Sequence, residues 1–176
     1  MNRSWMFCGT FALVLVVPAL AAELETPETR LAGLGLQLPD ASAPVANYVP
    51  AVRSGSLLFL AGHIPRDGAG NVVAGKVGRE LDEAAGAAAA RQTALALLAT
   101  LKDEVGDLTR VKRIVRVGGF VNATAEFTRH SQVINGCSDL LVDVFGARGR
   151  HARAAVGTNS LPLNAAVEIE MIVELE

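Results

Sequence analysis

Apolar side chains recur at helical spacing in two segments of the chain. Residues 81–108 (LDEAAGAAAARQTALALLATLKDEVGDL) carry acids in their first turn and contain no proline, and residues 127–146 (FTRHSQVINGCSDLLVDVFG) end at a glycine. Apolar positions three and four residues apart form one stripe on a helix. We therefore predict two helices whose buried positions are Ala90, Thr93, Ala94, Leu97, Leu98 and Leu101 in the first and Val133, Ile134, Cys137, Leu140, Leu141 and Val144 in the second.

Other segments have the composition of β-strands. Two short strands are predicted at residues 47–53 and 57–62, joined by the turn RSGS, and a longer β-branched strand at 111–123. The last two strands are expected at 152–158 and 165–175, separated by the turn NSLPLN. The order strand, strand, helix, strand, helix, strand, strand predicts an α+β domain, with both helices on one face of a mixed sheet.

The last predicted strand alternates strictly between two kinds of side chain. One face carries Val167, Ile169, Met171, Val173 and Leu175, and the other carries Glu168, Glu170, Ile172 and Glu174. The apolar face is expected to pack on the helices. The acidic face is either solvated, as is usual for an antiparallel sheet, or available for contact with another subunit.

A single arginine, Arg153, lies among small residues in the strand predicted at 152–158. Glu168 follows 15 residues later (168 − 153), across one turn. The planar fork of a guanidinium suits a carboxylate, and adjacent strands would place the two side chains near each other. The spacing leaves two interpretations open, a structural ion pair between strands and a functional site.

Two other candidate sites fail on their spacing. The stretch GNVVAGKV, residues 70–77, fits part of a phosphate-binding loop, but Val77 stands where a Ser or Thr would hold magnesium. We interpret it as a glycine-rich loop with residues at positive φ and one short strand at Val72 and Val73. The three histidines have no metal-ligand spacing, so no metal site is expected.

Composition narrows the class of partner. The chain has 176 residues, 51% of them hydrophobic, and a formal net charge of −2, which describes one domain of ordinary size. The basic run Arg110, Lys112, Arg113 and Arg116 has no interleaved aromatic residues for base stacking. We therefore interpret this run as a solvated face and expect a small-molecule or protein partner, with no nucleic acid.

Residues 1–21 have the features of a secretory signal peptide. Arg3 supplies the positive charge, residues 7–17 the apolar core, and Ala19-Leu20-Ala21 a small-residue cleavage site. Cleavage is expected after Ala21 or Ala22, the alternative being an uncleaved membrane anchor. The mature protein is then expected to be periplasmic or secreted, with no stable membrane association.

The mature chain is predicted to have two parts. Residues 22–43 hold prolines and glycines and are predicted to form an irregular leader, followed by the domain at 44–176. Cys137 is the one cysteine left after cleavage, so no intrachain disulfide can form, and a buried, inert thiol is expected.

Four stretches of the chain resemble the Rid family, the reactive intermediate deaminases also called the YjgF family. These are NYVPAVRSGSLLFLAGHIP, VKRIVRVGGFVNA, INGCSDLLVDVFG and, most closely, ARAAVGTNSLPLNAAVEIEMIVE. The similarity spans about residues 44–175 and is closer to the chorismate-mutase-like, endoribonuclease-named branch than to the best-known deaminases. It implies a chorismate-mutase-like fold and a homotrimer with the sheets turned inward as a barrel, the helices outside and three clefts between subunits.

The resemblance also implies a reaction and its residues. The arginine matching Arg153 grips a substrate carboxylate, the glutamate matching Glu168 helps to position water, and Tyr48 and Asn135 match positions that line the same cleft. The implied reaction hydrolyses a 2-imino or enamine acid to a 2-oxo acid and ammonia. Such an imine carbon is already electrophilic, so orientation, an activated water and proton transfer suffice and no cofactor is expected.

The chain departs from the family pattern at the cleft. The family's YSQA reads YVPA here, and its SGQ reads AGH, so Ala61 replaces a serine, Gly62 is kept and His63 stands at the glutamine position. Ala155 replaces a common cysteine. These losses leave a second interpretation open, a non-catalytic trimer that binds small carboxylates, and a third, an endoribonuclease, follows from a name that some family members carry.

Overall fold

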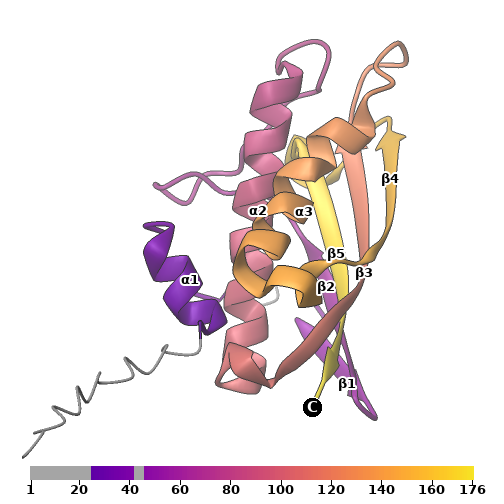
Figure 1. Ribbon diagram of the computed structural model, residues 1–176. Coiled ribbons are helices and arrows are strands. Elements are labelled where there is room, and N and C mark those ends of the chain that lie inside the picture. The colour runs from indigo at the N-terminus through magenta and orange to yellow at the C-terminus, as the bar shows by residue number, and fades with distance from the viewer. Residues whose placement is uncertain (1–24, 42–45) are drawn as a thin grey trace, which may run out of the picture.

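The computed structural model describes residues 25–41 and 46–176, so the predicted signal peptide and its cleavage site lie outside the described residues. In the described part the helices are α1 (Pro27–Gly33), α2 (Glu83–Val105) and α3 (His130–Phe145), with 3₁₀ turns η1 (Leu108–Arg110), η2 (Gly146–Gly149) and η3 (Pro162–Asn164). The strands are β1 (Ala51–Ser54), β2 (Leu57–His63), β3 (Val111–Asn122), β4 (Ala152–Thr158) and β5 (Val167–Leu175), as Figure 1 shows.

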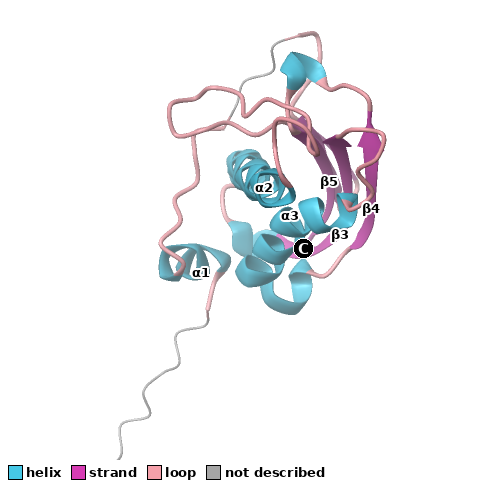
Figure 2. Cartoon of the chain, turned by 90° about the horizontal axis from the view of Figure 1, so that it is seen from above, coloured by secondary structure: helices cyan, strands magenta, loops and turns pink. Residues whose placement is uncertain are grey.

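The strands form one mixed sheet in the order β1-β2-β5-β3-β4. β3 and β4 run parallel, and the other neighbours are antiparallel. Parallel neighbours need a crossover connection, which α3 provides. α2 and α3 lie on the same side of the curved sheet (Figure 2), which confirms the predicted α+β architecture.

Most predicted boundaries agree with the structure to within a few residues, and β1 differs. It begins at Ala51 rather than at residue 47, because Pro50 has no N–H to donate to a ladder. The Pro50 carbonyl still accepts from the Ala61 N–H at 2.9 Å. Val72 and Val73 form no strand; Val72 makes only an isolated bridge to Arg66.

The predicted leader contains a helix, which corrects the expectation of an irregular segment. The Thr26 hydroxyl accepts from the Thr29 N–H at 3.1 Å, the Thr29 hydroxyl contacts the Thr26 N–H at 2.9 Å, and Pro27 occupies the first turn of α1. This reciprocal capping followed by proline is a local helix start that a count of prolines obscures. Leu31 is buried in the core, and Glu28 Oε1 accepts from the Leu108 N–H at 2.9 Å, which docks the segment onto η1.

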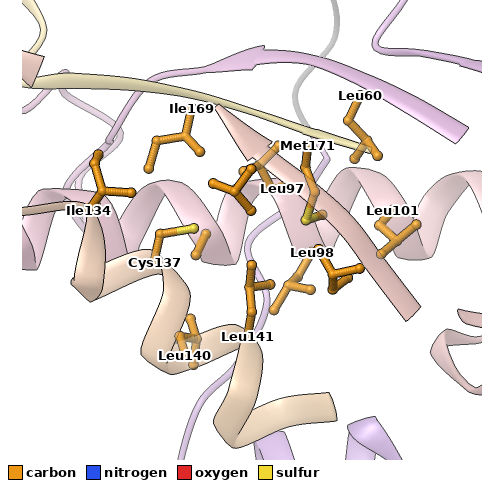
Figure 3. Close-up of a cluster of buried hydrophobic side chains, with 14 of the residues drawn as sticks. Leu60, Leu97, Leu98, Leu101, Ile134, Cys137, Leu140, Leu141, Ile169 and Met171 are labelled. Carbon is orange, nitrogen blue, oxygen red and sulfur yellow. The ribbon is translucent and has the colours of Figure 1, made fainter. Parts of the chain in front are cut away.

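The core lies between the sheet and the two long helices (Figure 3). Every residue of the two predicted apolar stripes is buried. α2 is long and apolar enough to cross a membrane, but more than half of its apolar window is buried inside the domain, the arrangement of a core helix. On β5 the odd-numbered residues are buried and the even-numbered residues are half-buried, as the alternation predicted.

Candidate functional site

Arg153 is held on the edge of the sheet by α3. β4 is the outermost strand, and Arg153 Nη1 donates to Asn135 Oδ1 at 2.8 Å and to Ser138 Oγ at 2.9 Å. Asn135 and Ser138 are three residues apart and share one face of the helix. Ala155, two residues further along β4, packs partly against the core. Among the described residues no carboxylate pairs with Arg153, so its charge is free for an anionic ligand.

His151 extends this cluster. Its Nδ1 lies 2.6 Å from the Gly149 carbonyl, and its Nε2 lies 3.0 Å from Ser138 Oγ. Burial lowers the pKa of His151, the bond to Gly149 offsets this in part, and the positive charge of Arg153 lowers it further. His151 is therefore neutral at pH 7. Ser138 and His151 were not predicted as site residues, although Ser138 follows Asn135 by three residues on one helix face and His151 lies two positions before Arg153.

Glu168 lies over the backbone of β2, on the face of the sheet opposite to Arg153. A Cβ at Gly62 would collide with the Glu168 carboxylate, so glycine is needed there for the close approach. Burial raises the pKa of Glu168, and repulsion from Glu170 raises it further. Tyr48 is exposed and lies two residues before Pro50, whose carbonyl accepts from the Ala61 N–H of β2.

The structure corrects the expectation that Arg153 and Glu168 meet within one chain. β3 lies between β4 and β5, with Phe120 paired to Glu168 on one side and to Val156 on the other. Arg153 contacts α3, whereas Glu168 pairs with the exposed Phe120 and projects from the other face of the sheet. The predicted residues form two clusters, Arg153, Asn135 and Ala155 at the edge beside α3, and Glu168 with Gly62 where β5 meets β2. Tyr48 is exposed on the segment before β1.

His63 belongs to neither cluster. It is buried beneath α2, with Nδ1 2.8 Å from the Ala61 carbonyl and Nε2 2.8 Å from Thr100 Oγ1. Burial lowers the pKa of His63, and the Ala61 bond offsets this only in part. These contacts give His63 a structural role, joining β2 to the long helix.

We expect the stability of the protein to fall on acidification, partly through His63. Because its pKa is lower in the folded than in the unfolded chain, the stability that it contributes is complete above its unfolded pKa of about 6.5 and is lost as the pH falls below that value. In urea denaturation, His63→Gln should show a shallower fall in the free energy of unfolding from about pH 7 to pH 5 than the wild type. An unchanged slope in His63→Gln would contradict the assignment.

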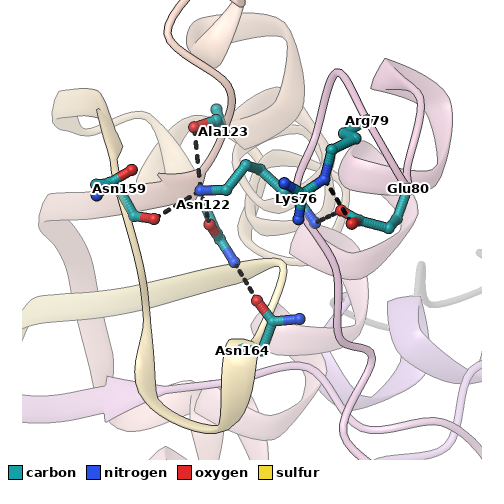
Figure 4. A network of polar contacts seen from close by, with 7 residues as sticks. All are labelled: Lys76, Arg79, Glu80, Asn122, Ala123, Asn159 and Asn164. Atoms are coloured by element: carbon teal, nitrogen blue, oxygen red, sulfur yellow. Dashed lines mark hydrogen bonds and ion pairs between the residues drawn. The ribbon is translucent and has the colours of Figure 1, made fainter.

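Lys76, the lysine of the rejected phosphate-loop motif, makes its hydrogen bonds within the protein. Its Nζ donates to Asn122 Oδ1 at 2.7 Å, to the Asn159 carbonyl at 2.6 Å and to the Ala123 carbonyl at 3.3 Å (Figure 4). Gly70 and Gly75 have φ values of 85° and 130°, as the loop interpretation predicted. Lys76 therefore joins the glycine-rich loop to the ends of β3 and β4, and its three donors are used.

The basic run along β3 is paired with acids or carbonyls. Lys112 and Arg113 contact Glu174 at 2.8 and 2.7 Å, Arg116 contacts Glu170 at 2.9 Å, and Arg110 Nη1 donates to the Val105 carbonyl at 2.8 Å. Cys137 is fully buried, as expected, and burial raises the pKa of its thiol to about 12, which makes it inert at neutral pH.

Residues 28–175 match a protein family described as "YjgF/chorismate mutase-like, putative endoribonuclease". The match begins inside α1 and therefore starts before the predicted domain start at residue 44. Both clusters lie inside the matched region.

Three relatives are similar over most of their length. Protein TCP17 of Trypanosoma cruzi is 47% identical over 147 residues, which is 83% of this chain and 92% of TCP17. The structure of Atu1372 from Agrobacterium tumefaciens, a protein of unknown function, is 46% identical with a TM-score of 0.80 and covers 85% of this chain and 92% of its own. A protein of Shewanella oneidensis described as a putative endoribonuclease is 35% identical with a TM-score of 0.83 and covers 85% and 99%.

Proposed function

Because the chain belongs to the YjgF/chorismate-mutase-like family, we propose that Arg153 of one copy and Glu168 of a neighbouring copy together form a cleft that hydrolyses 2-imino or enamine acids. The observation that carries the proposal is the pair of incomplete clusters. Arg153 has only neutral partners among the described residues, and Glu168 has a raised pKa and no described cation beside it. Each cluster holds the charge that the other lacks.

The surface of the sheet supports assembly of several copies. On the face that the helices leave open, Phe59, Phe120 and Val156 are 41%, 38% and 46% exposed. Large apolar side chains gathered on an open sheet face are typical of a subunit interface. β4, which carries Arg153, is also an unpaired edge strand. The family resemblance favours a homotrimer with these faces turned inward.

In the proposed cleft Arg153 binds the substrate and Glu168 moves protons. The Nε and Nη2 edge of Arg153 grips the substrate carboxylate bidentately and fixes the imine carbon in place. An enamine acid takes a proton from solvent at its β-carbon and so gives the same protonated imine as an imino acid. Water adds its oxygen to the carbon of the protonated imine, and its proton passes to the Glu168 carboxylate. A raised pKa suits this role, because the carboxyl must both accept and return a proton near neutral pH.

Completing the reaction needs no further group. Glu168 returns the proton to the nitrogen of the carbinolamine and accepts the hydroxyl proton as the C–N bond breaks. The bonding electron pair leaves with ammonia, the carbonyl forms, and the carboxyl proton passes to ammonia. The products are a 2-oxo acid and ammonium, with Glu168 restored as a carboxylate.

A second candidate function is binding of small carboxylates without turnover. Ala61 and Ala155 support it, since they stand where the family resemblance implies a hydroxyl and a thiol that would help to orient a small imine.

Endoribonuclease activity, which the descriptions of the family and of one relative name, has less support. The cations along β3 are already paired with acids or carbonyls, so they offer no free basic surface to a phosphate backbone.

The test is ammonia release by the mature protein, residues 22–176, from imino acids generated in situ from several amino acids. Release above the uncatalysed rate supports the deaminase. Saturable binding of 2-oxo acids without release favours the binding protein, and cleavage of a long RNA would favour the nuclease.

We include export in the proposal, because residues 1–21 have the features of a secretory signal peptide, and secretion of a fusion to those residues would test it.

A further inference from the structure

A chain of hydrogen bonds runs from the backbone after α3 to the guanidinium of Arg153. The Gly149 carbonyl lies 2.6 Å from His151 Nδ1, and His151 Nε2 lies 3.0 Å from Ser138 Oγ. The same oxygen lies 2.9 Å from Arg153 Nη1. One end of the chain is therefore fixed to the backbone, and the other end is the arginine on which carboxylate binding depends.

The donor and acceptor capacities of these groups fix the direction of every bond. A carbonyl only accepts, so the Nδ1 of neutral His151 donates to Gly149 and the Nε2 is left as an acceptor. A guanidinium only donates, so Ser138 Oγ accepts from Arg153 and directs its own proton to Nε2. The chain is fully satisfied with His151 neutral. Ser138 and Gly149 face the ring with neutral groups, the nearby Cys137 thiol is protonated, and Arg153 is the charged group beside it.

The arrangement leaves one edge of Arg153 free. The two protons of Nη1 go to Ser138 and to Asn135 Oδ1, at 2.9 and 2.8 Å. Nε and Nη2 donate to no residue in the described part of the chain. These two nitrogens form the edge of the guanidinium that binds a carboxylate with two parallel hydrogen bonds.

We propose that Ser138 and His151 are positioning residues that hold Arg153 with its Nε and Nη2 edge toward the ligand carboxylate, a role that rests on the function proposed above. Arg153 is exposed and has a long side chain, so without this support it would have to be ordered when the ligand binds. That ordering weakens affinity by about tenfold. The two residues therefore set the affinity for 2-oxo and 2-imino acids without taking part in the chemistry.

The test uses the mature protein and its Ser138→Ala, His151→Ala and His151→Gln variants, with pyruvate as the probe. Ser138→Ala and His151→Ala should weaken pyruvate binding about tenfold in calorimetry and raise KM to match, with kcat within about twofold of the wild type. His151→Gln keeps an acceptor for the Ser138 proton and should restore most of the affinity. Ser131→Ala, at an exposed serine of the same helix, is the control and should bind like the wild type.

Nitrogen NMR of the Arg153 side chain tests the positioning itself. In the wild type, slow rotation about the Nε–Cζ bond should give separate Nη signals, and in Ser138→Ala these signals should average. If the wild type releases no ammonia but Ser138→Ala weakens pyruvate binding, the proposed hydrolysis is wrong and the positioning role of Ser138 is supported. If pyruvate does not bind at all, the NMR comparison alone tests the positioning role, which averaged Nη signals in Ser138→Ala would support. Pyruvate affinity or Arg153 signals unchanged in Ser138→Ala would overturn the inference.

Discussion

Arg153→Ala should reduce kcat/KM for imino acid hydrolysis by about 100-fold or more while leaving the fold intact. Two charge-assisted hydrogen bonds to the substrate carboxylate are lost together, and each contributes about 1.5–3 kcal/mol. A loss of about 2.7 kcal/mol already corresponds to 100-fold. The measurement is initial-rate ammonia release with the variant and the wild type side by side.

The matched control for this substitution is Arg150→Ala. Arg150 is also exposed and lies three positions before Arg153, so the variant removes the same charge from the same region. Its activity should stay within about twofold of the wild type, because it loses only long-range electrostatic attraction. Equal losses in both variants, or full activity in Arg153→Ala, would contradict a specific carboxylate contact.

Gly136→Ala should have the largest effect on stability, lowering the free energy of unfolding by about 3 kcal/mol. Gly136 on α3 packs against the backbone of α2, where an added Cβ would collide with the Ala87 carbonyl, a backbone atom that cannot rotate away. Alanine gains about 1 kcal/mol of helix propensity over glycine, but the collision outweighs this gain. Thermal unfolding should show a Tm lower by roughly 6–12 °C.

Gly68→Ala provides the comparison for the glycine substitution. A Cβ at Gly68 would meet no atom within 4 Å, so its Tm should stay within about 2 °C of the wild type. If Gly136→Ala were as stable as the wild type, the helices would not be in contact at this position and the packing of α2 on α3 would need revision.

The elements of this fold could be predicted because their signals are local. The stripe from Ala90 to Leu101 and the alternation from Val167 to Leu175 each reflect one buried face of one element. The capped start of α1 at Thr26 is equally local and could have been recognised from Thr26, Pro27 and Thr29, the spacing of a capping box with proline in its first turn. It was missed because prolines and glycines elsewhere in residues 22–43 favoured an irregular segment.

The arrangement of the candidate site could not be predicted, because it depends on pairing between distant strands. β4 and β5 are joined by a short turn and resemble a hairpin in the sequence, yet β3 lies between them. The register on β3 also differs: Arg153 pairs with the buried Val117 and Glu168 with the exposed Phe120, so the two side chains lie on opposite faces of the sheet. The cluster of Ser138 and His151 behind Arg153 likewise depends on how α3 crosses the sheet edge, which no single segment encodes.

The central claim is that one cleft takes Arg153 from one copy and Glu168 from another, and subunit mixing tests it most directly. Arg153→Ala and Glu168→Gln, each inactive alone, are unfolded together in equal amounts and refolded. About a quarter of the clefts should then pair an intact arginine (one half) with an intact glutamate (one half), and about a quarter of wild-type ammonia release should return. No recovery, in mixed oligomers verified by mass spectrometry, would contradict the shared cleft.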